Sequence, residues 1–169
     1  MIYSLVHFPD IDTERVNQLR SKYDPQVGLI QPHITLMFPL QRVIAEETLV
    51  DHLRSVLCDQ HSFPIHLHGL DQSWDDYLFL LVDEGRDGFA DLHAKIYTGL
   101  LTDLKQTNCA YVPHVTLGAF AGNTIGNVEA FDEAKQLELD YRCVVDKLDL
   151  LKIDEERTRI LGRREFFLT

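Results

Sequence analysis

Two copies of one five-residue motif hold the side chains of this sequence that are best suited to chemistry. Pro32-His33-Ile34-Thr35-Leu36 and Pro113-His114-Val115-Thr116-Leu117 share the form Pro-His-aliphatic-Thr-Leu and lie nearly half the chain apart. An imidazole can take up or release a proton near neutral pH, and a threonine hydroxyl donates a hydrogen bond. Two such units facing each other would frame one anionic group, and a phosphate fits this description well.

The motifs predict two β-strands. Ile34 and Val115 are β-branched, a type that favours a pleated, half-buried surface. Side chains alternate between the faces of a strand, so His33 and Thr35 are expected on the open face while Ile34 and Leu36 enter the core. The second copy should place its histidine and threonine in the same way.

Hydrophobic periodicity predicts the elements that must position these strands. Residues 1–82 follow a βαβαββ order that returns in the second half, so we expect a single domain over 1–169 with two similar lobes. The expected elements are a strand near residues 1–8, helices from Asp12 or Thr13 to Tyr23, at 45–57, 88–101 and 124–136, strands at 63–67 and 77–82, and a terminal hairpin of 146–153 and 159–168.

The net charge of the chain limits the length of nucleic acid that it can be expected to bind. The chain has 169 residues with 16 Lys and Arg against 27 Asp and Glu, a net charge of −11, which argues against broad binding to long nucleic acid because such binding neutralises phosphates. A small phosphodiester or a short RNA end remains compatible. The local exception is the basic cluster Arg157, Arg159, Arg163 and Arg164, which is either a solvated hairpin or a track for a strand.

Cysteine use and hydropathy indicate the compartment. Cys58, Cys109 and Cys143 are odd in number and lack Cys-x-x-Cys spacing, so we expect reduced thiols and a cytoplasmic protein. No apolar run approaches the length of a membrane span, and we therefore expect no membrane partner. We also expect a monomer.

His66 and His68 are the other histidine pair on one predicted strand face. They could begin a metal site, but zinc needs three or four protein ligands and no third is evident from the sequence. We therefore expect no metal, and a metal-dependent hydrolase using His66 and His68 is kept as an alternative. Phosphate-binding Gly-x-x-x-x-Gly-Lys, dinucleotide-binding Gly-x-Gly-x-x-Gly and Gly-x-Ser-x-Gly motifs are absent.

The paired motifs at 32–36 and 113–117, in this order within a small domain, resemble the two signatures of the two-histidine phosphoesterase superfamily. Its members include 2′-5′ RNA ligase-like proteins and RNA cyclic phosphodiesterases. The resemblance implies an α+β fold with two pseudo-symmetric lobes of antiparallel sheet, helices on the outside and a central cleft. It also implies catalysis without a metal or other cofactor.

By this resemblance His33 and His114 are the catalytic acid and base, with His114 as the base, while Thr35 and Thr116 bind the phosphoryl oxygens. Tyr111, two residues before Pro113, is a candidate substrate-binding residue, with packing as the alternative. The expected activity is phosphodiester hydrolysis on a 2′,3′-cyclic phosphate or a short 2′-5′ linked nucleotide. A rival interpretation from another class is a module that binds a phosphorylated ligand without turning it over.

Overall fold

A computed structural model describes residues 1–40, 42–73 and 75–169. Helices and strands alternate along the chain in nearly the order expected from the sequence. The elements are β1 (Ile2–His7), α1 (Thr13–Tyr23), β2 (Ile34–Met37), α2 (Glu46–Leu57), β3 (Phe63–Gln72), β4 (Tyr77–Val82), α3 (Arg86–Ile96), a 3₁₀ helix (Gly99–Leu104), β5 (His114–Ala119), α4 (Thr124–Leu137), β6 (Asp140–Val145), β7 (Lys147–Ile153) and β8 (Ile160–Phe167).

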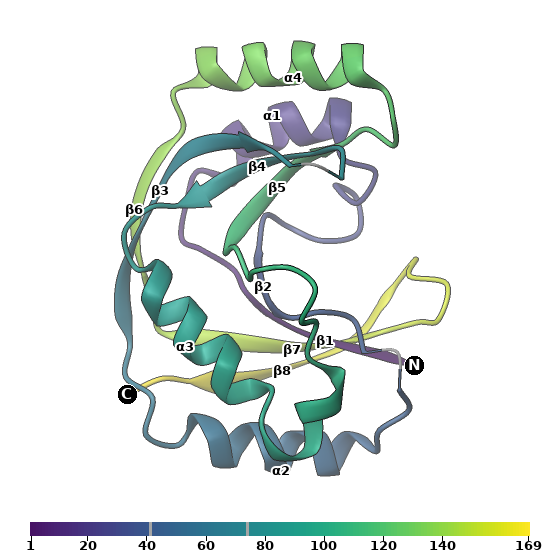
Figure 1. The fold of residues 1–169 in the computed structure, drawn as a ribbon, viewed down its shortest axis with the longest axis vertical. Helices are drawn as coiled ribbons and strands as arrows, with labels where there is room; N and C mark the ends of the chain where they lie inside the picture. The colour runs from purple at the N-terminus through teal and green to yellow at the C-terminus, as the bar shows by residue number, and fades with distance from the viewer. Residues whose placement is uncertain (41, 74) are drawn as a thin grey trace.

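The strands form an eight-stranded sheet in the order β6-β3-β4-β5-β2-β1-β7-β8, with antiparallel pairing between all neighbours. The sheet is strongly curved, with α1 and α4 on the outer side of one arm and α2 on the outer side of the other (Figure 1). This arrangement confirms the predicted α+β class with two lobes of antiparallel sheet. No helix among the described residues is long and apolar enough to cross a membrane.

The lobes do not coincide with the two halves of the sequence. One lobe contains β2, β1, β7 and β8, and the other contains β5, β4, β3 and β6, so the first half supplies strands to both. Helices α1 and α4 pack against the β3–β4–β5 lobe, whereas α3 packs on β2 and against α2 (Figure 1). Each lobe is therefore assembled from strands that are distant in sequence.

Local signals explain most element boundaries. The Asp12 side chain accepts a hydrogen bond from the Arg15 backbone N–H at 3.0 Å and so caps α1, which ends before Pro25.

The predicted helix at 88–101 is wrong at its C-terminal end, because α3 stops at Ile96. Gly99 then adopts a φ of +48°, a left-handed conformation that interrupts an α-helix, and the chain continues as a 3₁₀ helix.

Strand β6 was not predicted. Its charged Asp140 and Arg142 point outward while Tyr141 and Cys143 are only partly buried, so the segment lacks a strong apolar signal. Its position as the edge of the sheet beside β3 accounts for this polarity, because charged side chains protect an exposed edge from pairing with other chains.

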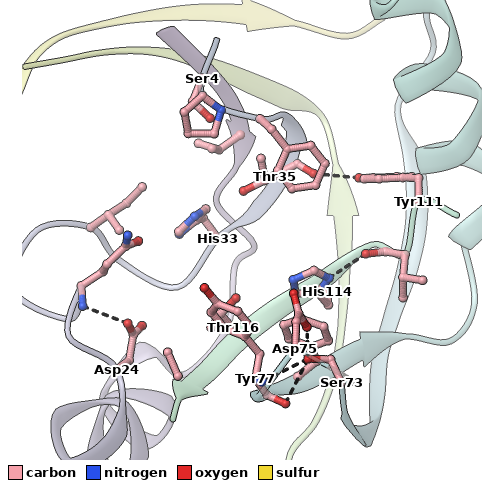
Figure 2. Close-up of a pocket in the computed structure, with 18 of the residues that line it drawn as sticks. Ser4, Asp24, His33, Thr35, Ser73, Asp75, Tyr77, Tyr111, His114 and Thr116 are labelled. Carbon is pink, nitrogen blue, oxygen red and sulfur yellow. Dashed lines mark hydrogen bonds between the residues drawn. The ribbon is translucent and has the colours of Figure 1, made fainter. Parts of the chain in front are cut away.

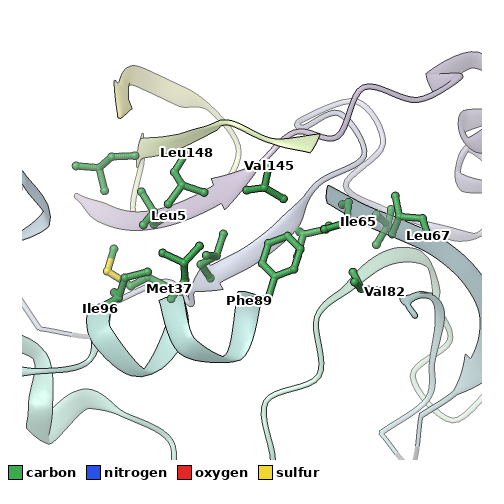
Figure 3. Close-up of a cluster of buried hydrophobic side chains, with 14 of the residues drawn as sticks. Leu5, Met37, Ile65, Leu67, Val82, Phe89, Ile96, Val145 and Leu148 are labelled. Carbon is green, nitrogen blue, oxygen red and sulfur yellow. The ribbon is translucent and has the colours of Figure 1, made fainter. Parts of the chain in front are cut away.

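The main core lies between the sheet and its helices. Figure 3 shows Phe89 and Ile96 of α3 against Met37 of β2 and Leu5 of β1, and all four side chains are fully buried. Replacing Phe89 with alanine would cost about 3–5 kcal/mol, since it removes a large apolar group and leaves a cavity. This packing fixes the outer face of β2, so that the opposite face of the same strand is held toward the cleft.

Candidate active site

The two motif strands meet at the centre of the sheet. β2 and β5 are joined by the pair Ile34 and Val115, which are the same position in the two motif copies. Continuing this antiparallel register places His33 across from Thr116 and Thr35 across from His114. The two histidines are thus diagonal neighbours, a relation that separates the Cβ atoms by somewhat less than about 7–8 Å.

Burial alternates along both motifs. Ile34 and Val115 are fully buried, as are the leucines that follow in each copy. The histidines and threonines are partly exposed, and Figure 2 shows His33, Thr35, His114 and Thr116 pointing into the same space. The structure therefore brings together the four residues that the motif pattern selects.

That space is a cleft of about 640 Å³ that reaches into both lobes. Besides the two motifs it is lined by strands β1, β4 and β7, by the loop that follows α1, and by the segment that precedes β5. The volume falls in the range of sites for small molecules, which are typically 300–1,000 Å³. A single nucleotide or dinucleotide is of suitable size for such a cleft.

Backbone carbonyls fix the proton positions on both histidines. His33 Nδ1 donates to the Gln31 carbonyl at 2.9 Å, and His114 Nδ1 donates to the Val112 carbonyl at 2.6 Å. A carbonyl only accepts, so the proton of a neutral ring is on Nδ1 and Nε2 carries a free lone pair. Each Nε2 can therefore take up a proton, or release one after it has been protonated.

Aromatic neighbours pack against both imidazoles and bury them in part. The ring of Phe79 stacks on His114 with centroids 3.6 Å apart, and Phe8 lies 6.2 Å from His33 in a tilted arrangement. Burial lowers the pKa of His33 to about 4, and the positive charge of Arg20 acts in the same direction. Burial also lowers the pKa of His114, although the nearby carboxylates oppose this shift. Both rings are thus neutral at pH 7 in the free protein.

Tyr111 lines the cleft and also supports the first motif. Its hydroxyl donates to the Thr35 carbonyl at 2.9 Å, and one face of its ring stacks on His93 with centroids 4.0 Å apart. His93 Nδ1 in turn donates to the Leu36 carbonyl at 2.8 Å. These contacts hold β2 in place, and burial raises the Tyr111 pKa so that its hydroxyl stays protonated. Substrate binding by Tyr111 remains a prediction.

His66 and His68 lie on β3, away from the motif strands. Their rings stack with centroids 5.2 Å apart, and His66 Nε2 bonds Asp140 Oδ1 at 2.8 Å across the β3–β6 pair. Within 1–40, 42–73 and 75–169, no group of three or more His, Cys, Asp or Glu side chains is placed to hold a metal ion. The geometry therefore gives no support to the metal-hydrolase alternative.

The basic cluster divides into two parts. Arg159 pairs with Asp154, Arg163 with Asp149, and Arg164 with the two glutamates that begin α2. Arg157 instead lines the cleft from the turn between β7 and β8. The cluster does not form a continuous basic track beside the motifs.

Several cleft residues were not selected by the sequence analysis. Tyr77 and Phe79 were assigned only to an apolar strand, and Asp71 and Asp75 to no function, yet all four line the cleft. The alternation Tyr77-Leu78-Phe79 in β4 is the signal that could have placed two aromatic rings on the open face.

Comparisons with known proteins agree with this architecture. Residues 8–157 match the sequence pattern of the 2′-5′ RNA ligase superfamily. Relatives named "Putative phosphoesterase" include one from Bacillus cereus strain B4264, 25% identical over 155 residues, and one from Bacillus licheniformis, 26% identical over 156 residues. The first alignment covers 89% of this chain and 88% of the relative, and the second covers 89% of each.

Solved structures show the same fold. Escherichia coli LigT in its apo form has a TM-score of 0.60 at 18% identity, covering 99% of this chain and 97% of LigT. LigT complexed with 3′-AMP gives a TM-score of 0.65 at 19% identity, with 99% and 98% coverage. The match over residues 8–157, together with two His-x-Thr motifs facing one cleft, shows that this chain belongs to the 2′-5′ RNA ligase superfamily of two-histidine phosphoesterases.

Proposed function

We propose that this protein is a phosphodiesterase that opens a 2′,3′-cyclic phosphate, or cleaves a short 2′-5′ linked nucleotide, by acid–base chemistry between His33 and His114. The observation that carries this proposal is the Ile34–Val115 pair, which places two imidazoles and two hydroxyls diagonally around a space fit for one phosphoryl group. The reaction needs no metal ion, because protein side chains can supply the acid, the base and the hydrogen-bond donors.

In the proposed reaction one histidine takes a proton from water on its free Nε2 while the water oxygen bonds to phosphorus. The bond from phosphorus to one ribose oxygen breaks, and the other histidine gives that oxygen a proton, leaving a phosphate monoester. Thr35 and Thr116 donate hydrogen bonds to the non-bridging oxygens, where negative charge is stabilised in the transition state. After the reaction the two histidines again carry one proton between them, now on the ring that acted as the base.

The charges around the two rings bear on which histidine is the acid. Family resemblance implies His114 as base, whereas Asp71 and Asp75 beside His114 and Arg20 beside His33 favour the proton on His114. A substrate with a p-nitrophenolate leaving group decides between these assignments, because such a group departs without a proton. The alanine variant that lacks the acid should regain much of its rate with this substrate, and the variant that lacks the base should not.

Three observations support a short nucleotide as the substrate. The cleft volume fits one or two nucleosides, and the exposed ring of Tyr77 beside Phe79 offers a surface on which a base can stack. Structures of LigT, which has the same fold, are complexes with 3′-AMP, ATP and NADP+. The net charge of −11 disfavours a long polyanion.

The test is a screen of nucleoside 2′,3′-cyclic phosphates, cyclic-phosphate RNA ends and 2′-5′ linked dinucleotides. The wild type is compared with His33→Ala and His114→Ala, each of which should lose about 10²–10⁴-fold in rate while remaining folded. His68→Ala, a change on β3 at a residue that does not line the cleft, is the matched control and should keep full activity. Binding without turnover in the wild type would favour the phosphate-binding module instead, and near-normal rates in both motif variants would refute the catalytic assignment.

A further inference from the structure

The two sides of the cleft differ in chemistry although the motifs at its centre are alike. On the side of β3 and β4 the lining includes the carboxylates of Asp71 and Asp75, both exposed, and Ser73, which lies between them in the sequence and whose hydroxyl donates a hydrogen bond to Asp75. We call these three residues the acidic wall. An anionic group other than the one at the motifs is repelled from this side.

The opposite side is formed by the lobe of β1, β7 and β8. Apart from Ser4, the side chains that these strands contribute to the lining are aliphatic and lie on one face of the paired strands, and we call these aliphatic side chains the apolar wall. They are Ile2, Val6, Leu151, Ile153 and Ile160. Apolar surface of this kind gains free energy when it contacts a sugar face, a base or an aliphatic chain, but it cannot bind a charge by itself.

Arg157 stands at the end of the apolar wall. Among the described residues that line the cleft, it is the single lysine or arginine. The other three arginines of its cluster are paired with carboxylates, while Arg157 makes no ion pair with any described residue. Its guanidinium is therefore available to a ligand, and a guanidinium binds phosphate or carboxylate through two parallel hydrogen bonds.

The turn between β7 and β8 is built to hold Arg157. Asp154 accepts hydrogen bonds from the Thr158 backbone N–H at 2.7 Å and from the Arg159 backbone N–H at 3.0 Å. Glu155 is engaged by the N-terminal ammonium at 2.7 Å. Arg157 itself has a φ of +56°, which is unfavourable for a side-chain-bearing residue and is maintained by this bonded turn. Asp154 and Glu155 are thus occupied elsewhere, and Arg157 lines the cleft.

The strand register separates Arg157 from the position between the two histidines where the substrate phosphate would bind. Val6 pairs with Thr35 at the level of the motifs, and Ile2 pairs with Ile153, next to the turn. The four residue steps from Ile2 to Val6 on β1 span about 13 Å, at about 3.3 Å per residue. Figure 1 shows the β7–β8 hairpin extending beyond the sheet and bending toward the other lobe. A group bound by Arg157 is therefore separate from the phosphate held between the two histidines.

We propose that Arg157 binds a second anionic group, a phosphate or a carboxylate, on the substrate arm that lies along the apolar wall. This inference rests on the proposed function and names its substrate class: a short phosphodiester that carries one further negative charge on one arm. The acidic wall repels that charge and Arg157 attracts it, so the two walls together set the direction in which the substrate enters. An otherwise symmetric pair of motifs then acts on an asymmetric substrate.

The test compares a nucleoside 2′,3′-cyclic phosphate that bears a 5′-phosphate with the same compound bearing a 5′-hydroxyl. The wild type should prefer the 5′-phosphate by about tenfold or more in kcat/KM, as expected for a hydrogen bond between charged groups. Arg157→Gln should lose this preference while retaining the rate on the 5′-hydroxyl compound, and Arg157→Lys should keep part of it. Arg159→Gln, in the same turn but paired with Asp154, is the control and should keep the full preference.

The inference would be overturned if the wild type showed no preference for the 5′-phosphate compound, or if Arg157→Gln kept that preference. If the wild type turns over neither compound, the proposed function fails, and the dissociation constants of the same two compounds, measured by calorimetry, then decide the role of Arg157. Loss of the 5′-phosphate preference in binding would still support Arg157, and an unchanged preference would exclude it. Thermal unfolding of each variant confirms that the comparison is made between folded proteins.

Discussion

As the pH is raised, the catalytic efficiency of this protein should begin to fall below the pH at which an ordinary histidine titrates. Whichever of His33 and His114 is the acid, it must gain a proton on Nε2 before it can donate one, because Nδ1–H is already bonded to a carbonyl. Burial lowers the pKa of both rings, for His33 to about 4. The protonated acid is therefore scarce in the free protein at pH 7.

The size of the effect follows from these shifts. With a pKa of about 4, roughly one His33 ring in a thousand is protonated at pH 7. Once the pH exceeds both pKa values, the fraction of protein with one proton on the pair falls tenfold for each further pH unit. Because kcat/KM reports the free enzyme, it should fall about 100-fold between about pH 6.5 and about pH 8.5. A bound phosphate anion favours the protonated ring, so the decline in kcat should begin at higher pH.

Initial rates on a nucleoside 2′,3′-cyclic phosphate across this pH range provide the measurement. Phe79→Leu removes the ring stacked on His114 and admits water, so it should raise the His114 pKa and move the alkaline decline upward. Phe167→Leu, a change at a ring that is 71% exposed, is the matched control and should leave the profile unchanged. A level kcat/KM up to pH 8 in the wild type would refute the argument from burial.

Three further substitutions test other parts of the structure. Asp24→Ala should lower the free energy of unfolding by about 3–5 kcal/mol, because it leaves the fully buried Arg20 without its partner at 2.8 Å; a cost under about 1 kcal/mol in urea denaturation would contradict this. Tyr111→Phe should cost about 1 kcal/mol of stability and less than tenfold in kcat/KM, and a far larger loss would place its hydroxyl in the chemistry. Thr35→Val and Thr116→Val should each lower kcat by about 10–10²-fold without loss of stability, less than either histidine variant, and unchanged rates would remove them from the site.

The centre of the site could be predicted from the sequence because its geometry is local. In a strand, the face on which a side chain lies depends only on alternation, so each five-residue motif determines where its own histidine and threonine point. That the two motifs would line one central cleft followed from the family resemblance rather than from the residues. The Ile34–Val115 pair is the contact that joins them, and no local pattern specifies such a contact.

The walls of the cleft could not be predicted, because they depend on strands brought together across the whole chain. Asp71 and Asp75 face His114 only because β4 lies beside β5, and Arg157 reaches the same cleft only because β7 pairs with β1. The motifs are near copies and are related by the pseudo-symmetry of the sheet, whereas the walls come from unlike segments. In the proposed reaction, the chemistry at phosphorus is therefore encoded in short repeated motifs, and the proposed choice of substrate arm is encoded in the topology that surrounds them.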